Sequence, residues 1–163
     1  MHLFFDIETT GLNVFENRII AICIQRPDSD VPVTFYGEDE RKIINQFWEA
    51  AEDSILFGFN SASFDIPFII RRSIILGVRL KTFKQHFDLR KIANCFSYSN
   101  DKYCKGKLSD WALVLGYIPK THNGENMVEF YNNKKWKEIK NHVEEDVFIT
   151  KLLFNRLKDV DLI

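Results

Sequence analysis

Residues 1–12 of the chain have the sequence MHLFFDIETTGL, in which two acidic residues interrupt an apolar run. Three apolar residues precede Asp6, and only Ile7 separates Asp6 from Glu8. Residues two apart in a β-strand point to the same face, so both carboxylates lie together. Burying them costs several kcal/mol unless they are paired or bind a cation, and each raises the pKa of the other. Residues 1–17 contain no Lys or Arg, so either a divalent metal or a basic side chain brought in by the fold has to balance the pair.

This first strand, predicted over residues 2–8, opens an ordered series of elements. Two further strands are predicted at residues 18–26 and 31–37, and the short turns between them indicate an antiparallel meander. Apolar residues then recur at helical spacing over residues 38–53. The apolar segment at residues 54–60 follows that helix, which predicts a buried strand parallel to the first.

The rest of the sequence is predominantly helical in pattern, with capping residues and glycines that mark the ends. The predicted segments are residues 63–77 between Ser63 as N-cap and Gly77, residues 79–96 as a short strand and then a helix beginning near Asp88, residues 107–116 with Ser109 as cap and Gly116 as stop, and a last helix over about residues 136–157. Together these elements predict an α/β protein with a mixed five-stranded sheet flanked by helices.

Length and composition predict one globular domain over residues 1–163. Hydrophobic residues make up 45% and charged residues 28%, which is typical of a globular domain in water. No apolar run approaches the roughly 20 residues of a membrane span, and no signal peptide pattern is present at the start. Cys23, Cys95 and Cys104 have no CxxC spacing and indicate reduced thiols, so we expect a cytoplasmic protein without membrane contact.

The net charge of −1 argues against a protein that coats nucleic acid by bulk electrostatics, but allows an enzyme that holds a few nucleotides through metal ions. Lysines gather in two stretches, each of which is either a solvated face or a contact for a nucleic-acid backbone. They are Lys102, Lys105 and Lys107 in the segment DKYCKGK, and Lys134, Lys135, Lys137 and Lys140 near the last helix.

More acidic residues are predicted to join Asp6 and Glu8. Asp65 falls in the first turn of the helix that follows the fourth strand, and it reaches the same edge of the sheet if that strand neighbours the first. Asp146 lies among apolar residues of the last helix, and His142 is one turn earlier on the same face. Such a cluster favours Mg²⁺ or Mn²⁺. Two such ions about 4 Å apart stabilise the attacking and leaving oxygens of a phosphoryl displacement, and a histidine can take the proton of the attacking water.

Three segments resemble, in the same order, the motifs of the DEDD 3′–5′ exonucleases. FDIETTGL at residues 5–12 resembles the first motif in its D-x-E-T form. NSASFDIPFI at residues 60–69 closely resembles the second motif of the family B DNA polymerase proofreading domains, N-S-x-x-F-D-x-P. HVEEDVFIT at residues 142–150 takes the place of the third motif, Y-x-x-x-D. The resemblance covers nearly the whole chain, as a free-standing exonuclease domain.

The resemblance implies an RNase H-like fold and two metal ions held by four carboxylates. It also implies contacts with a substrate. The backbone near Thr9 and Thr10 receives the 3′-terminal nucleotide, and Leu12 wedges against the last base. Asn60 orders the substrate phosphate or the metal-bound water, and Phe64 packs on the nucleotide. The implied ligands are Asp6, Glu8, Asp65 and Asp146, the implied substrate contacts are Thr9, Thr10, Leu12, Asn60 and Phe64, and Asp88 resembles a recurrent Asp between the second and third motifs.

The third motif departs from the family pattern. Relatives have either Tyr four residues before the last Asp or His five residues before it, whereas this chain has His142 at four and Asn141 at five. One helical position corresponds to a rotation of about 100°. We expect His142 to orient or deprotonate the attacking water despite this change.

The leading prediction is a metal-dependent exonuclease that releases nucleoside 5′-monophosphates from the 3′ end of single-stranded DNA or RNA. One alternative is a catalytically idle RNase H-like module that binds nucleic acid, which the position of His142 and the absence of a strongly basic surface favour. The other is a hydrolase of small nucleotides, which the acidic residues alone would permit.

Overall fold

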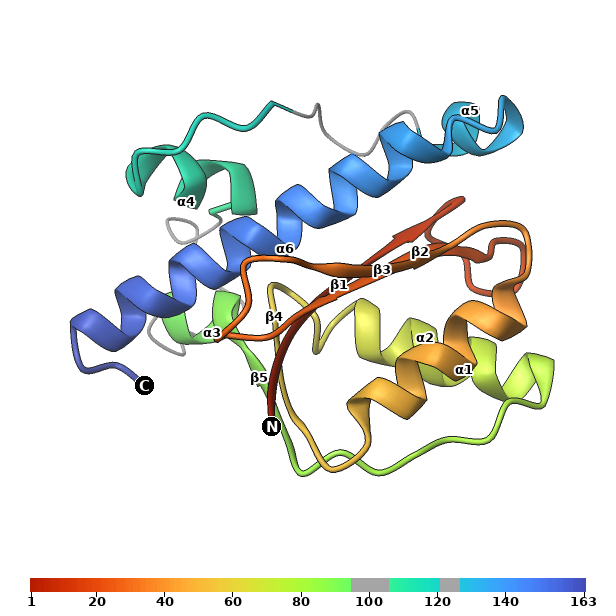
Figure 1. Ribbon diagram of the computed structural model, residues 1–163, viewed down its shortest axis with the longest axis horizontal. Coiled ribbons are helices and arrows are strands. Elements are labelled where there is room, and N and C mark those ends of the chain that lie inside the picture. The colour runs from red at the N-terminus through yellow and green to blue at the C-terminus, as the bar shows by residue number, and fades with distance from the viewer. Residues whose placement is uncertain (95–105, 121–126) are drawn as a thin grey trace.

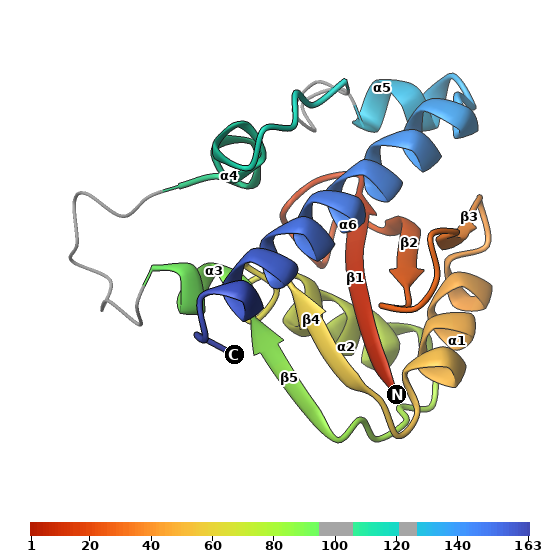
Figure 2. The ribbon, with the colours of Figure 1, turned by 60° about the vertical axis from the view of Figure 1, so that its left-hand side comes forward.

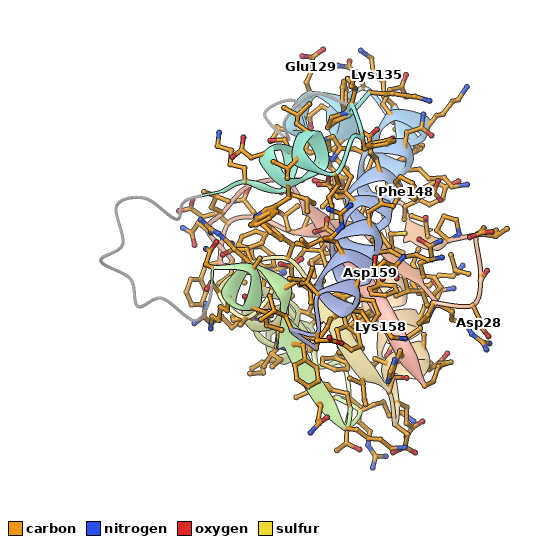
Figure 3. The ribbon with its side chains drawn as sticks, turned by 90° about the vertical axis from the view of Figure 1, so that its left-hand side faces the viewer. Asp28, Glu129, Lys135, Phe148, Lys158 and Asp159 are labelled. Atoms are coloured by element: carbon orange, nitrogen blue, oxygen red, sulfur yellow. The ribbon has the colours of Figure 1, made fainter. Side chains whose placement is uncertain are left out.

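The computed structural model describes residues 1–94, 106–120 and 127–163, and within them a mixed five-stranded sheet has the order β3-β2-β1-β4-β5. Helices α1 (Glu40–Ala51) and α2 (Asp65–Leu76) cover one face of this sheet, and the long helix α6 (Trp136–Asp159) crosses the other (Figures 1 and 2). The last turn of α6 carries Lys158 and Asp159 on the surface (Figure 3). In the part of the chain that is described, no helix is long and apolar enough to cross a membrane.

The strands confirm the predicted meander and the predicted crossover. β1 (His2–Thr9) pairs antiparallel with β2 (Ile19–Gln25), and β2 pairs antiparallel with β3 (Val33–Tyr36). β4 (Ile55–Gly58) lies parallel to β1, and β5 (Gln85–Asp88) lies parallel to β4. A helix between β3 and β4 returns the chain to the same end of the sheet, which is what parallel pairing requires. The central position of β1 puts its acidic residues in the middle of the molecule.

The two faces of β1 meet different helices. Phe5 and Ile7 point into a core shared with α1 and α2. Phe4 points the opposite way, into a core shared with α6. Because side chains alternate along a strand, Asp6 and Glu8 lie on the same side as Phe4 and are directed toward α6. The strand therefore presents both carboxylates to the helix that carries the third motif.

The predicted N-cap of α2 is wrong. The helix begins at Asp65, after Phe64, and no side chain caps it. The backbone N–H groups of Ser63 and Phe64 instead donate to the carbonyl of Asn60 at 3.1 and 3.2 Å, in a tight turn where Asn60 has a φ of 60°. This turn keeps Ser63 outside the helix and puts Asp65 at its first position. The end of α2 at Gly77, with a φ of 64°, is as predicted.

The predicted cap of α4 (Leu108–Val114) is also wrong. The helix begins before Ser109, because the carboxylate of Asp110 accepts the backbone N–H of Lys107 at 2.7 Å and closes the first turn one residue earlier. Gly116, with a φ of 81°, follows the end of this helix as predicted. The helix after Asp88 is present as α3 (Leu89–Ala93), whereas the six-residue helix α5 (Met127–Asn132) was not predicted.

Arg72 of α2 and Glu40 of α1 form an ion pair that also fixes the loop after β1. Arg72 Nε and Nη2 donate to the two carboxylate oxygens at 2.8 and 2.7 Å, and the Glu40 side chain is only 2% exposed. Arg72 Nη1 donates to the carbonyl of Val14 at 3.0 Å, and Glu40 accepts the backbone N–H of Ile19 at 2.8 Å. The segment between β1 and β2 is therefore held by two helices.

We expect an Arg72→Met variant to lose about 3 kcal/mol of unfolding free energy, because the buried carboxylate of Glu40 then keeps only the more distant Arg18, at 4.0 Å, as a basic partner. For a chain of this size the loss corresponds to a fall of roughly 9 °C in Tm. Urea denaturation with the exposed neighbour variant Arg71→Met as control measures it. Equal free energies of unfolding for the two variants would show that the Arg72–Glu40 ion pair does not stabilise the fold.

Candidate active site

Four carboxylates meet where β1, the start of α2 and the middle of α6 come together. β1 supplies Asp6 and Glu8, α2 supplies Asp65, and α6 supplies Asp146. Burial raises the pKa of Asp6 well above its ordinary value, and the charges of Asp65, Asp146 and Glu8 raise it further. Since each of these charges acts on Asp6, the acidic residues that the sequence predicted to converge do lie together around this side chain.

Asp65 is held by the backbone at the junction of β1 and α2. Its side chain is buried, and its carboxylate accepts the backbone N–H groups of Ile7 and of Asp65 itself. Burial raises the pKa of Asp65 from 3.8 to about 7, and the two backbone hydrogen bonds oppose this rise only partly. The start of a helix favours an anion, so the turn that delays α2 places Asp65 where backbone N–H groups can hold its carboxylate.

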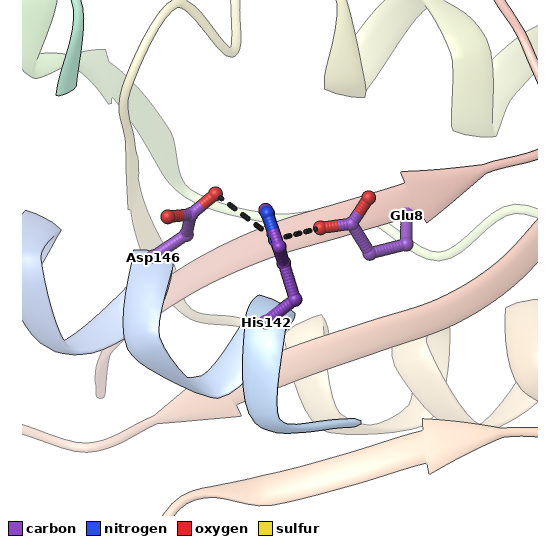
Figure 4. A group of neighbouring side chains, drawn as sticks. All are labelled: Glu8, His142 and Asp146. Carbon is purple, nitrogen blue, oxygen red and sulfur yellow. Dashed lines mark ion pairs between the residues drawn. The ribbon is translucent and has the colours of Figure 1, made fainter. Parts of the chain in front are cut away.

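His142 completes the cluster from α6. Its Nδ1 lies 2.7 Å from Glu8 Oε1 and 3.7 Å from Asp146 Oδ2, and the imidazole stands between the two carboxylates (Figure 4). One ligand atom from each of these three residues lies within 4.8 Å of the others, which is close enough to surround one metal ion. The predicted spacing of four residues along α6 therefore directs His142 and Asp146 into the same site.

Asp146 lies at the more open side of the site. Its side chain is 28% exposed, compared with 10% for that of Glu8. Burial raises the pKa of Asp146 from 3.8 to about 7; His142 lowers it, and Glu8 and Glu145 raise it. The site is thus closed toward β1 and accessible from the Asp146 side.

The sequence left two ways to balance the negative charge of the acidic pair: a divalent metal ion, or a basic side chain brought in by the fold. Among residues 1–94, 106–120 and 127–163, His142 is the only basic side chain within 4.0 Å of any of the four carboxylates. The fold brings in no Lys or Arg to neutralise them at that distance. Oxygen ligands that remain crowded and desolvated are the donor set that Mg²⁺ and Mn²⁺ prefer, so these residues fit a divalent cation.

The raised pKa values predict an unusual dependence of stability on pH. Asp65 and Asp146 have pKa values of about 7 in the folded protein and ordinary values of 3.8, so between pH 4 and 7 the folded protein binds more protons than the unfolded chain. Without metal, we expect the free energy of unfolding to rise by roughly 5 kcal/mol as the pH falls from about 8 to about 5, and to level off below about pH 4. Urea denaturation in chelator measures this; a fall in stability over the same interval would contradict it.

A hollow of about 440 Å³ lies beside Glu8. Four of the residues predicted to contact substrate line it, whereas Asn60 does not. Two more lining residues come from α5, which the sequence did not reveal: a six-residue helix gives too little periodicity to detect. The lining residues from these segments are Thr9, Thr10, Leu12 and Phe64 from the first two motifs, and Met127 and Val128 from α5.

Asn60 and Asp88 form a network behind the second motif. The carboxylate of Asp88 accepts the backbone N–H groups of Asn60, Ala62 and Arg90, at 2.8, 3.1 and 3.1 Å. Arg90 Nη1 donates to the side-chain oxygen of Asn60 at 2.9 Å. Through these hydrogen bonds, Asp88 supports the turn that precedes Asp65. The role of Asn60 toward a substrate stays a prediction.

The lysine stretches and the cysteines are only partly described. Within DKYCKGK, residues 101–105 lie outside the described part of the chain, and so do Cys95 and Cys104. Cys23 is a buried free thiol, and burial raises its pKa to about 12. Of the second stretch, the lysines with ion pairs bond to neighbouring acidic residues near α5 and α6, as on a solvated face: Lys134 to Glu38 at 3.0 Å, Lys135 to Glu129 at 3.7 Å and Lys140 to Glu144 at 3.7 Å.

Comparison with known proteins adds a family and a fold. A family model described as the RNase H superfamily matches residues 3–158. An uncharacterized protein of Methanocaldococcus jannaschii is 33% identical over 174 residues, and the match covers 97% of this chain and 96% of that protein.

Two solved structures superpose on nearly the whole chain. The family B DNA polymerase of the hyperthermophilic archaeon Pyrobaculum calidifontis matches with a TM-score of 0.80 at 21% identity over 99% of this chain. The zinc-ion-bound form of E. coli ExoI in complex with ssDNA matches with a TM-score of 0.63 at 15% identity over 97% of this chain. The chain spans only 25% and 40% of the length of those two chains, so these similarities show a shared fold.

Proposed function

Because the chain belongs to the RNase H superfamily, we propose that it is a metal-dependent 3′–5′ exonuclease that releases nucleoside 5′-monophosphates from single-stranded nucleic acid. The observation that carries this proposal is the cluster of Asp6, Glu8, Asp65 and Asp146, in which His142 is the only base within 4.0 Å in the described part of the chain. The shared fold supports it, since one of the two solved structures holds both a zinc ion and ssDNA.

The four carboxylates would hold two Mg²⁺ or Mn²⁺ ions, which when bound stabilise charge on the attacking and leaving oxygens of an in-line displacement. The side chain of His142 takes a proton from the attacking water. The carboxylate of Glu8, whose Oε1 lies 2.7 Å from Nδ1, stabilises the positive charge of the imidazolium that forms. The water oxygen bonds to phosphorus while the bond to the 3′ oxygen of the preceding nucleotide breaks, and that oxygen takes a proton from solvent.

The hollow beside Glu8 has the volume of a small-molecule site and would take the terminal nucleotide. The backbone at Thr9 and Thr10 follows directly on the carboxylate, so it lies next to the scissile phosphate. Leu12 is 82% exposed, which is unusual for a leucine and leaves it able to pack against the last base. Phe64 lies across the hollow and offers an aromatic ring to the same nucleotide.

Digestion of oligonucleotides tests the proposal directly. Single strands of DNA and RNA with a label at the 5′ end are incubated with Mg²⁺ or Mn²⁺, and the expected result is a ladder that shortens from the 3′ end with release of nucleoside 5′-monophosphates. Asp146→Asn is the inactive control. Shortening no faster than in this control rules out the exonuclease; binding of the strand without shortening would instead fit the nucleic-acid-binding module, and hydrolysis of mononucleotides alone would fit a small-nucleotide hydrolase.

A further inference from the structure

A second hollow, of about 840 Å³, lies along the edge strand β5 and the end of α6. Aromatic rings form much of its wall. Phe57 and Phe87 stack with centroids 5.3 Å apart and an interplanar angle of 13°, and Phe154 meets Phe57 edge-on at 4.8 Å. Phe87 is 37% exposed, so part of this aromatic surface is open to solvent. None of the residues that line the hollow beside Glu8 lines this one.

The charged groups that line this hollow are mainly basic. Lys91 of α3 and Lys158 of α6 are both exposed lining residues, and Figure 3 shows Lys158 in the last turn of α6. Among the described residues, Asp88 has the one side-chain carboxylate that lines the hollow, and it is already engaged by three backbone N–H groups, among them those of Asn60 and Ala62. The aromatic wall therefore has a positive rim, which suits a ligand with flat rings and negative charges.

This hollow adjoins the candidate active site through the second motif. Ala62 and Asp88 line it, and both belong to the network that supports the turn before Asp65. A strand whose 3′ end lies at Asp65 can therefore continue past this turn. Stacking on aromatic rings together with phosphate contacts to lysines is how proteins hold single strands without regard to sequence.

We propose that the aromatic hollow along β5 binds upstream nucleotides of the same single strand, with bases against Phe87 and phosphates at Lys91 and Lys158. This inference rests on the proposed function and extends it: the enzyme prefers strands long enough to reach the hollow. A trinucleotide fills only the site beside Glu8, whereas a strand of about 12 nucleotides engages both places.

The test compares a thymidine trinucleotide with a thymidine strand of about 12 nucleotides, in binding and in cleavage. Lys91→Gln/Lys158→Gln and, separately, Phe87→Ala are expected to weaken binding of the long strand about tenfold and to leave cleavage of the trinucleotide unchanged. The lysine variant also lowers the slope of log Kd against log salt concentration by about 1.4, since each phosphate contact to a single strand contributes about 0.7. The control Lys42→Gln/Arg79→Gln removes the same charge from exposed positions elsewhere and leaves binding unchanged.

Two outcomes overturn the inference. They are unchanged binding of the long strand by both variants, and an equal loss of binding for the long and the short strand. Melting curves of each variant show that it is folded. A further result would separate the two proposals. If wild type cleaves no strand, and the variants nevertheless lose binding of the long strand selectively, the proposed exonuclease function is wrong but the hollow is still a site for a single strand.

Discussion

An Asp6→Asn variant is expected to lose at least about a thousandfold in the rate of 3′-end hydrolysis and yet to unfold at a higher temperature than wild type in chelator. The loss of rate follows because Asp6 is central to the acidic cluster: Asp65, Asp146 and Glu8 all act on it. The gain in stability follows because, without metal, burial and these charges make an ionised Asp6 unfavourable. An uncharged amide of the same size removes this cost, and we expect about 1–3 kcal/mol, or roughly 3–9 °C in Tm.

The matched control for this variant is Asp159→Asn, which removes the same charge from an exposed position in the last turn of α6. It should change neither the rate nor the Tm. The metal response is a second difference: Mn²⁺ should raise the Tm of wild type but hardly that of Asp6→Asn. An Asp6→Asn protein that is less stable than wild type in chelator would show that the cluster is not a site of unrelieved repulsion.

A His142→Gln variant is expected to lose about a thousandfold in kcat with little change in KM for the oligonucleotide. Gln has no basic nitrogen, but its amide can still donate to Glu8, so the arrangement of the carboxylates should be kept. The deficit should narrow as the pH rises, because hydroxide replaces the water that needs a base. Single-turnover digestion over a range of pH measures both effects.

The control is Glu138→Gln, which introduces the same residue at an exposed position one turn earlier on α6, and it should have the wild-type rate. His142→Tyr places the residue of the family motif at the same spacing, so it should recover more activity than His142→Gln. If His142→Gln has the wild-type rate, then His142 is not the base that takes the proton of the attacking water. The presence of His in place of Tyr in the third motif would then not affect catalysis.

The overall fold was predictable because its signals are local and repeated. The alternation in β1 and the long apolar stripe of α6 follow from burial on one face, and both elements are where the sequence predicts them. Helix starts were less predictable, because they depend on competing hydrogen bonds. The turn closed by the carbonyl of Asn60 excluded Ser63 from α2, and the carboxylate of Asp110 started α4 ahead of Ser109.

The candidate site was predictable to the extent that its residues sit in motifs. The acidic residues of the three motifs do meet: the first motif lies at the end of β1, the second at the start of α2, and the third in the middle of α6. Contacts between distant segments carried no such signal. Arg72 reaches Glu40 across 32 positions in the sequence and the loop after β1 across 58, and α5 supplies Met127 to the hollow beside Glu8 without any motif.

Anomalous scattering from a crystal soaked in Mn²⁺ tests the central claim most directly. We expect strong anomalous peaks among Asp6, Glu8, Asp65 and Asp146, and the same crystals of Asp6→Asn should show these peaks weakened or gone. An acidic cluster without any anomalous peak at saturating Mn²⁺, in wild-type crystals at a pH of about 8, above the pKa values of Asp65 and Asp146, would contradict the account.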